Sequence, residues 1–578
     1  MKAEKAMRPP ARFVQRPGIR AVVVLALGIL ALTEIAAVGG FGHTTGAQAQ
    51  EQQAVRYGPR QAMSQAPCGP DDAPETDLQG RVPPQDLLTG RAFQPYNCNL
   101  ELVGNFPSSG YASFDTYEDC AYWGRNVAVG GVQVLDVSDP TSPLPTATLT
   151  TPAMLDPWES LRVHAGRGLL VADSQVHGWL DVYDVSEDCR QPQLLSTTFI
   201  GLASGHEGWL SPDGMTYYMS TGVSTGDLFG PNTVFPVDIS DPTNPQVLAE
   251  WAFEHQTHGG WTTEDGTLSL ICQQMPPPDD KLLIVDTTEV ASREPDPQPK
   301  VIATIPMGDN KWCQNAYRVT YDGHPYLIVF GEAPGADSCA RAADGWATSA
   351  YPRFYDLADE RNPVHVSDAL LEVQLPEHCE EVQGEGVLVN QFGYGVHYCS
   401  PDRIYDPTIL ACAWFGSGLR VLDIRDPHNP KELGYFNPGM PTGLTGAAPR
   451  PVVRADLGQI WFVTSVGGFH AVEFRDGVWP FESSARCPEF PDFWFAHYNP
   501  TSRCTTASRE GVGRPAPGDA DPAGPPSEPP PVATPVEPGE PDSGAGPLPA
   551  TGGGLGALAL LLASVAVMWR QRARSDVR

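Results

Sequence analysis

Histidines recur in phase with a repeated sequence pattern, and they are the first residues in this chain that could do chemistry. The four are His164, His206, His258 and His397. Gln314 and Arg450 hold comparable places in two further units. Each of these residues precedes a short apolar segment. If those segments surround a common axis, the imidazoles converge on it. Converging imidazoles can bind a transition metal or titrate together near a pH of about 6.5.

Two interpretations of these histidines stay open. In the first, the four are ligands of a transition metal on the axis. In the second, each imidazole is structural and hydrogen-bonds the backbone of the next unit. Repeated residues serve packing more often than chemistry, so we favour the structural interpretation.

Familiar catalytic motifs are missing from the sequence. There is no Gly-x-Ser-x-Gly, no His-Glu-x-x-His, no Gly-x-x-x-x-Gly-Lys and no EF-hand loop. His206-Glu207 lacks a second histidine four residues further on. We therefore lean towards a protein that is not an enzyme. An extracellular enzyme with a histidine-lined metal site is the alternative, and the cofactor is unknown apart from that metal.

The histidines must be positioned by a repeat that covers the middle of the chain. Val132 to Pro140 reads VQVLDVSDP, and similar segments follow at Leu180, Val234, Leu282, Arg353 and Leu419, with a degenerate copy at Gly468. The aspartates of these segments are spaced 48 to 70 residues apart, at positions 136, 184, 238, 286, 356 and 423, with Glu473 last. Propeller blades are typically about 40 to 50 residues long. Two units therefore carry insertions.

Each unit contains the same structural signals. Four or five β-branched or apolar residues predict a strand. An Asp-Pro-x-x-Pro turn follows in three units, because proline cannot continue a strand. We expect the repeat aspartates to cap this turn rather than to catalyse a reaction. About four strands per unit cannot bury both faces of one sheet, but seven units packed around an axis can. The sequence thus predicts an all-β, seven-bladed β-propeller with four-stranded antiparallel blades; two packed β-sandwiches are the alternative.

The repeated segments resemble LVIVD repeats, and Leu282-Leu283-Ile284-Val285-Asp286 is the nearest copy. These repeats occur in bacterial and archaeal surface proteins. The resemblance covers residues 98–485 and implies a β-propeller. It implies almost nothing about activity.

The N-terminus is typical of a secretory signal peptide. Basic residues between Lys2 and Arg20 precede an apolar stretch from Ala21 to Leu32. Ala47 and Ala49 then supply the small side chains that signal peptidase reads. We predict a signal peptide at residues 1–49.

The C-terminus resembles the LPXTG cell-wall sorting signal of Gram-positive surface proteins. The motif is Leu548-Pro549-Ala550-Thr551-Gly552, and an apolar segment at 553–569 and a basic tail follow it. The resemblance implies that a sortase joins Thr551 to peptidoglycan. The alternative is an ordinary membrane anchor formed by one apolar helix.

Composition agrees with export. The formal net charge is -32, from 69 acidic and 37 basic residues, which disfavours a nucleic-acid partner. The 12 cysteines lie beyond the signal region, and an even number in an oxidising compartment favours disulfides. Pairings cannot be deduced from spacing; our guesses are Cys98 with Cys120, Cys399 with Cys412, and Cys487 with Cys504.

The expected organisation has six parts. They are a signal peptide (1–49), a loose extension or partial cap (50–97), the propeller (98–485), a cysteine-containing segment (486–504), a disordered Pro/Gly-rich acidic stalk (505–547) and the sorting signal (548–578). The predicted location is the extracellular face of a Gram-positive cell. The protein would be linked to the wall, or anchored in the membrane if unsorted. The predicted role is binding of an unknown extracellular protein, glycan or small ligand.

Overall fold

The computed structural model describes residues 58–478, apart from 111–112, 126–129, 176–177, 202–204, 222–231, 275–279, 310–311, 333–334, 384, 386–392, 440–448 and 476. The signal peptide, Ala47 and Ala49, the Cys487 and Cys504 pair, the stalk, and the sorting motif with its apolar segment all lie outside these residues. Within them, no helix is both long enough and apolar enough to cross a membrane.

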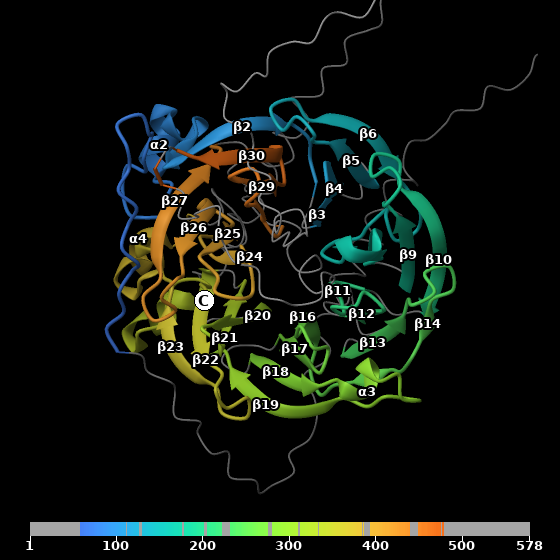
Figure 1. Cartoon of the computed structure of the whole chain (residues 1–578). Helices are drawn as coiled ribbons and strands as arrows, with labels where there is room; N and C mark the ends of the chain where they lie inside the picture. The colour runs from blue at the N-terminus through green and yellow to red at the C-terminus, as the bar shows by residue number, and fades with distance from the viewer. Residues whose placement is uncertain are drawn as a thin grey trace, which may run out of the picture. The chain divides into compact units, whose positions relative to one another are not determined.

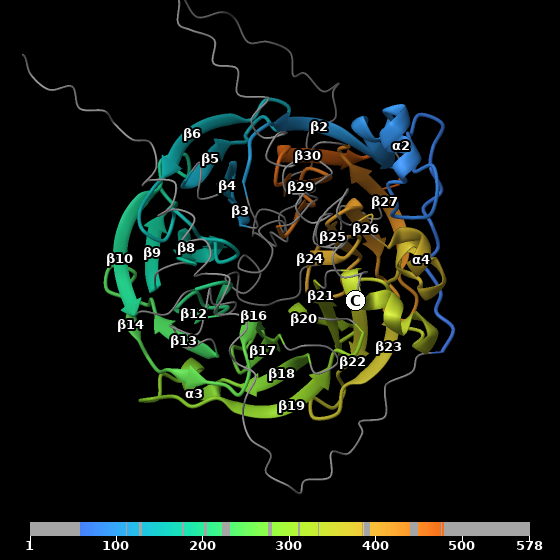
Figure 2. The same cartoon turned by 180° about the vertical axis from the view of Figure 1, so that it is seen from behind.

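Seven antiparallel sheets stand around one axis, as Figure 1 shows, and the prediction of a seven-bladed propeller is confirmed. In blades 1 to 5 the first strand along the chain lies nearest the axis and the last forms the rim, whereas blades 6 and 7 receive their outermost strands, β1 and β2, from the N-terminal side. Figure 2 shows the same order from behind, with β3, β16, β20 and β24 inside and β6, β10, β19 and β27 outside.

The first four blades are built from consecutive strands. Blade 1 contains β3 (Phe114–Tyr117), β4 (Cys120–Gly124), β5 (Val132–Asp136) and β6 (Leu144–Leu149). Blade 2 contains β7 (Arg162–His164), β8 (Leu169–Asp173), β9 (Gly178–Asp184) and β10 (Gln193–Gly201). Blade 3 contains β11 (Gly208–Leu210), β12 (Thr216–Ser220), β13 (Thr233–Asp238) and a rim strand in two pieces, β14 (Gln246–Val247) and β15 (Trp251–Ala252). Blade 4 contains β16 (Thr257–Thr262), β17 (Leu268–Gln273), β18 (Lys281–Asp286) and β19 (Lys300–Pro306).

The remaining blades include the two strands that enter from the N-terminal side. Blade 5 contains β20 (Cys313–Tyr321), β21 (His324–Gly331), β22 (Arg353–Asp356) and β23 (Val364–Asp368). Blade 6 contains β24 (Val396–Pro401), β25 (Ile409–Trp414), β26 (Gly418–Asp423) and β27 (Lys431–Asn437), with β1 (Tyr96–Cys98) added at its rim. Blade 7 contains β28 (Val452–Arg454), β29 (Gln459–Thr464) and β30 (Gly468–Phe474), and its rim strand is β2 (Leu100–Phe106).

Apolar side chains on both faces of each sheet explain why the blades pack as a ring. Successive side chains of a strand point to opposite faces of its sheet. In β8, Leu170 and Ala172 pack with blade 1, whereas Leu169 and Val171 pack with blade 3. Every blade that has two neighbours can bury both of its faces in this way.

The repeat aspartates end the third strand of their blades and cap the turn that follows, as predicted. Asp136 Oδ1 accepts a hydrogen bond from the Ser138 backbone N–H at 3.0 Å, and Asp238 Oδ1 accepts one from Ser240 at 2.8 Å. Equivalent bonds in four further blades join Asp184 to Ser186, Asp286 to Thr288, Asp356 to Ala358 and Asp423 to Arg425. These carboxylates are therefore structural.

Residues 58–98 form an ordered strap against the propeller rather than a loose extension. Helix α2 (Pro84–Thr89), the 3-10 turn η2 (Arg91–Phe93) and β1 belong to it. The strap is held because its charged side chains find buried partners. Arg60 pairs with Asp309 at 2.5 Å and with Asp368 at 2.7 Å, and Arg81 pairs with Glu385 at 2.8 Å. Composition alone suggested a loose segment because it does not show these long-range pairs.

Short helical segments occupy the loops. They are η3 (Ala165–Arg167), α3 (Thr288–Ala291), η4 (Gly335–Asp344), η5 (Glu372–Gln374), η6 (Pro376–His378) and α4 (Cys379–Val382). The last four lie in the two insertions that the repeat spacing predicted.

Five disulfides connect the described cysteines. They are Cys68–Cys98, Cys120–Cys189, Cys272–Cys313, Cys339–Cys379 and Cys399–Cys412. The guess of Cys399 with Cys412 is confirmed, since these residues face each other on β24 and β25. The guess of Cys98 with Cys120 is wrong. The guess relied on short spacing in the sequence. In the structure Cys120 pairs with Cys189 in a turn of the next blade, and Cys98 pairs with Cys68 within the strap.

The disulfides should differ in their contribution to stability. Cys120–Cys189 joins blades 1 and 2 across 69 residues, whereas Cys399–Cys412 closes 13 residues within blade 6. In the chain-entropy description the longer loop gives about 1.5 kcal/mol more stabilisation. We predict that Cys120→Ala with Cys189→Ala lowers the free energy of unfolding more than Cys399→Ala with Cys412→Ala. Denaturant titration of both double variants measures this difference, and an equal loss would contradict the prediction.

The buried contacts of the strap should give a specific dependence of stability on pH. The Asp368 side chain is 18% exposed. Its partial burial opposes ionisation, but His365, Arg353 and Arg60 outweigh burial and lower its pKa to about 2. Because this pKa is below that of an unfolded aspartate, its stabilisation is complete above about pH 5 and is lost as the pH falls towards 2. We predict that Asp368→Asn lowers the free energy of unfolding by about 2 kcal/mol at pH 7. The difference from wild type should shrink on acidification.

Unfolding titrations at several pH values measure this effect. Glu254→Gln is the control, because the Glu254 side chain is 82% exposed. A deficit of the Asp368 variant that is constant from pH 7 to pH 2 would contradict the assignment.

Candidate functional site

The inner strands bring several polar side chains together at the axis. His206 lies two residues before β11, His258 is the second residue of β16, and His397 is the second residue of β24. These three histidines come from blades 3, 4 and 6. The sequence prediction that they converge agrees with their placement.

Glu159 is at the centre of this group. It lies in the loop that leads into β7 of blade 2. Its Oε2 is 3.5 Å from His206 Nε2 and 3.6 Å from His258 Nε2, and its Oε1 is 3.2 Å from His397 Nε2. One carboxylate is therefore shared by three imidazoles.

A second carboxylate completes what we call the axial cluster: Glu159, His206, His258, Glu332 and His397. Glu332 directly follows β21 of blade 5, and its Oε2 is 3.0 Å from His397 Nε2. The five residues come from five successive blades. In two groups within the cluster the ligand atoms all lie within 4.8 Å of one another, close enough to share a metal ion, namely Glu159 with His206 and His258, and Glu159 with Glu332 and His397.

Hydrogen bonds from neighbouring inner strands fix the Glu159 carboxylate. Gln314 Nε2 donates to its Oε2 at 3.1 Å, and the Tyr398 hydroxyl donates to the same oxygen at 2.9 Å. Gln314 occupies the position in blade 5 that histidine occupies in blades 3, 4 and 6. The sequence analysis noted that equivalence, and the structure gives the residue a supporting role.

Glu207 supports His258 from the other side. Its Oε2 is 3.4 Å from His258 Nδ1, while its Oε1 accepts hydrogen bonds from Arg162 at 2.9 Å and Asn315 at 2.6 Å. Gly259 makes room for this carboxylate, since a Cβ there would overlap Glu207.

The cluster is almost completely buried, and its pKa values reflect that. His258 is 0% exposed, and the exposed fractions of the other four residues are all below a tenth. Burial, together with neighbouring His258, lowers the pKa of His206 to about 3. Burial also opposes charge on His397, but Glu159 and Glu332 outweigh it and raise its pKa to about 10. His206 is therefore neutral at physiological pH, and His397 is a cation between two carboxylates.

His164 does not join the cluster. Its Nε2 lies 2.9 Å from the Pro212 carbonyl oxygen, and its Nδ1 accepts a hydrogen bond from the Arg167 backbone N–H at 3.1 Å. It is the last residue of β7, as Leu210 is the last residue of β11. Counting back from these strand ends, the counterpart of His206 in blade 2 is Ser160. His164 is thus structural, in agreement with the structural interpretation of the histidines.

Sequence reasoning missed the three glutamates. Glu159 and Glu207 both precede an inner strand, so a search for any ionisable residue at that position would have found them. Glu332 follows a second strand, and nothing in its local sequence distinguishes it.

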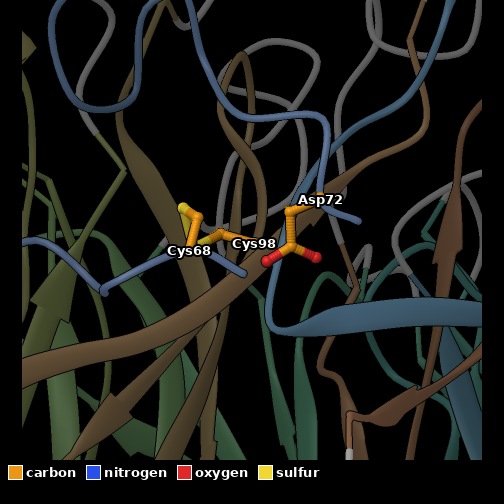
Figure 3. Close-up of side chains that lie close together, drawn as sticks. All are labelled: Cys68, Asp72 and Cys98. Carbon is orange, nitrogen blue, oxygen red and sulfur yellow. A yellow bond between two sulfur atoms is a disulfide. The ribbon is translucent and has the colours of Figure 1, made fainter. Parts of the chain in front are cut away.

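One further group of metal-binding residue types, Cys68, Asp72 and Cys98, lies within the strap (Figure 3). The two cysteines form a disulfide and offer no thiolate. Asp72 Oδ2 accepts a hydrogen bond from the Asn99 backbone N–H at 2.9 Å, and its Oδ1 accepts one from Arg475 at 2.7 Å. This group holds the strap in place and is not a metal site.

The buried pair of Arg162 and Glu207 offers a test of the electrostatics around the cluster. Their side chains are 9% and 0% exposed. Breaking a buried pair leaves an uncompensated charge, which costs about 3 to 5 kcal/mol. We predict that Arg162→Met lowers the free energy of unfolding by about this amount and that adding Glu207→Gln restores part of it.

A double-mutant cycle by denaturant unfolding measures the coupling between the two residues. The control is Arg425→Met, since Arg425 is 56% exposed where it pairs with Asp423, and exposed pairs contribute about 1 kcal/mol or less. Equal losses for the Arg162 and Arg425 variants would contradict the prediction.

Comparison with known proteins supports the repeat. Residues 119–151, which run from the end of β3 into the loop after β6, match the LVIVD repeat. No curated protein matches the chain. Among solved structures, the β-propeller domain of Cps50 (Swd1) from Myceliophteria thermophila aligns with 65% of this chain and 100% of its own length, at 12% identity and a TM-score of 0.43. The chain is therefore an LVIVD-repeat-containing β-propeller by its own sheets and by the repeat match.

Proposed function

We propose that this protein is an exported β-propeller, attached to the wall of a Gram-positive cell, that acts as a binding module for an extracellular ligand. The ordered C-terminal signal carries the proposal. Leu548 to Gly552 precedes an apolar segment and then Arg570, Arg572 and Arg574. Together with the signal sequence around Ala47 and Ala49, this order supports a location of the propeller outside the cell.

The disulfides support export. All ten cysteines among the described residues are paired, and structural disulfides are typical of oxidising compartments. The ring also supports a binding role, because a propeller presents loops from all blades on its two faces and such loops often carry binding residues. Fold alone does not define the ligand, which could be a protein, a glycan or a small molecule.

An extracellular enzyme is the second candidate, and the axial cluster favours it. Buried carboxylates and imidazoles with shifted pKa values are typical of functional sites. The same features occur in purely structural ion networks. We therefore place the binding module first.

Wall attachment predicts a clear effect of removing the sorting signal. In a Gram-positive host that expresses a sortase, a chain lacking residues 548–578 should appear in the medium, whereas the full chain should remain in the wall fraction until the peptidoglycan is digested. Immunoblotting of medium, wall digest and membrane fractions measures the distribution.

Two variants sharpen this experiment. Thr551→Ala removes the residue that would be joined to peptidoglycan while keeping the apolar segment, so it should move the protein from the wall digest to the membrane. Thr505→Ala, outside the motif, is the control. If the full chain and the Thr551 variant both fractionate with the membrane, the protein is membrane-anchored and the wall linkage is wrong.

A further inference from the structure

We propose that Glu159, His206 and His258 bind one divalent transition-metal ion of the Zn²⁺ class on the propeller axis. This inference goes beyond the proposed function and does not depend on wall attachment. It concerns a site built from blades 2, 3 and 4.

The distances within this triad fit the ligands of one ion. Ligand atoms about 2.0 to 2.1 Å from a tetrahedral ion lie about 3.4 Å from one another. Glu159 Oε2 is 3.5 Å from His206 Nε2 and 3.6 Å from His258 Nε2. Hydrogen bonds between nitrogen and oxygen are shorter, at about 2.7 to 3.2 Å. Both imidazoles are thus further from the carboxylate oxygen than an ordinary hydrogen bond, at the spacing expected of two ligands of one cation, and all three ligand atoms lie within 4.8 Å of one another.

Unpartnered polar atoms point to the same place. Among the described residues, His258 Nε2 has no hydrogen-bond partner, although the residue is 0% exposed. Buried polar atoms in proteins are normally satisfied, and an exception requires an explanation such as an ion. A metal at His258 Nε2 provides that explanation.

The surrounding residues form the outer shell that metal-binding histidines require. A metal-binding imidazole usually directs its second nitrogen towards a carboxylate, which orients the ring. Glu207 Oε2 lies 3.4 Å from His258 Nδ1 and has no hydrogen-bond partner of its own among the described residues. Gln314 and Tyr398 similarly fix Glu159.

The second triad, formed by Glu159, Glu332 and His397, differs from the first. His397 Nε2 lies 3.2 Å from Glu159 and 3.0 Å from Glu332, which are ordinary distances for charge-assisted contacts. Direct contacts already join the three residues of this triad. The geometry therefore assigns one ion, and not two, to the axial cluster.

Ligand chemistry selects the metal class. Two imidazoles and one carboxylate suit Zn²⁺ and similar ions, whereas Ca²⁺ and Mg²⁺ prefer oxygen ligands throughout. Three protein ligands leave a fourth tetrahedral position for water or for an oxygen or nitrogen atom of a ligand. The axial site would then take ligands that carry such an atom.

The test uses the full chain, purified without a polyhistidine tag, stripped with a chelator and dialysed against Zn²⁺ or Co²⁺. Elemental analysis should find one ion per chain. The Co²⁺ protein should show the visible absorption of a four-coordinate ion, and X-ray absorption should show nitrogen and oxygen ligands without sulfur. Zn²⁺ should also raise the thermal unfolding temperature, since it binds only the folded chain.

Matched variants locate the site. His206→Gln, His258→Gln and Glu159→Gln should each abolish stoichiometric binding. Glu207→Gln should weaken affinity by about 10- to 100-fold while keeping one ion per chain, because Glu207 only orients a ligand. His164→Gln is the control, as His164 is equally buried but lies outside the cluster. Circular dichroism checks that each variant is folded.

Three results would overturn the proposal. The first is wild-type protein that holds much less than one ion per chain after dialysis. The second is sulfur coordination, which would place the metal at cysteines. The third is an equal loss of binding in the His164 and His206 variants. If a ligand variant does not fold, the wild-type stoichiometry, the X-ray absorption and the Glu207 variant still test whether the metal binds at this site. Fractionation of the truncated chain tests wall attachment separately, so the two proposals fail independently.

Discussion

Closure of the ring is the constraint on which the rest of the structure depends. Blade 7 receives its rim strand from the N-terminal side of the propeller, where β2 pairs antiparallel with β30 from Leu100↔Phe474 to Phe106↔Phe469. Without this pairing, blade 7 would have an open edge and blades 1 and 7 would each expose one apolar face. With it, Trp123 and Phe114 of blade 1 pack against Trp461 and Phe469 of blade 7. Burial of these faces is the main driving force for the fold.

The strap is a second N-terminal segment that packs against blades formed much later in the chain. The chain crosses blades 5 and 6 before β1 and β2 join the sheets, and it is held there by buried apolar side chains such as Met63 and Val82 and also by charges. Arg420 in β26 is fully buried between Glu75 of the strap and Glu432 of β27. Such an ion network stabilises only when every partner is present, because a lone buried charge is strongly unfavourable. The network therefore couples placement of the strap to formation of blade 6.

The axial cluster is a consequence of closure. No two of its five residues share a blade, so their distances are set by the rotation from one blade to the next. A site of this kind is rigid because each side chain stands on or beside an inner strand. It is also polar in a position where burial would normally exclude charge. Gln314 and Tyr398 donate hydrogen bonds to its Glu159, and Arg162 and Asn315 donate to the neighbouring Glu207. This combination of rigidity and unsatisfied histidine nitrogens is what distinguishes the axis from the structural ion pairs elsewhere in the molecule.

The sequence by itself determined the repeat, the blade count and the role of the repeat aspartates, because these depend on local signals. Alternating apolar residues, a terminal aspartate and a proline turn act within one unit and recur in the next. The convergence of His206, His258 and His397 was also predictable, since their position within the repeat is the same. Only the tertiary structure decided that His164 lies four residues out of phase, that Glu159, Glu207 and Glu332 belong to the site, and that Cys120 pairs with Cys189. These contacts join residues of different blades, and their distances are set by ring geometry, which no local pattern encodes.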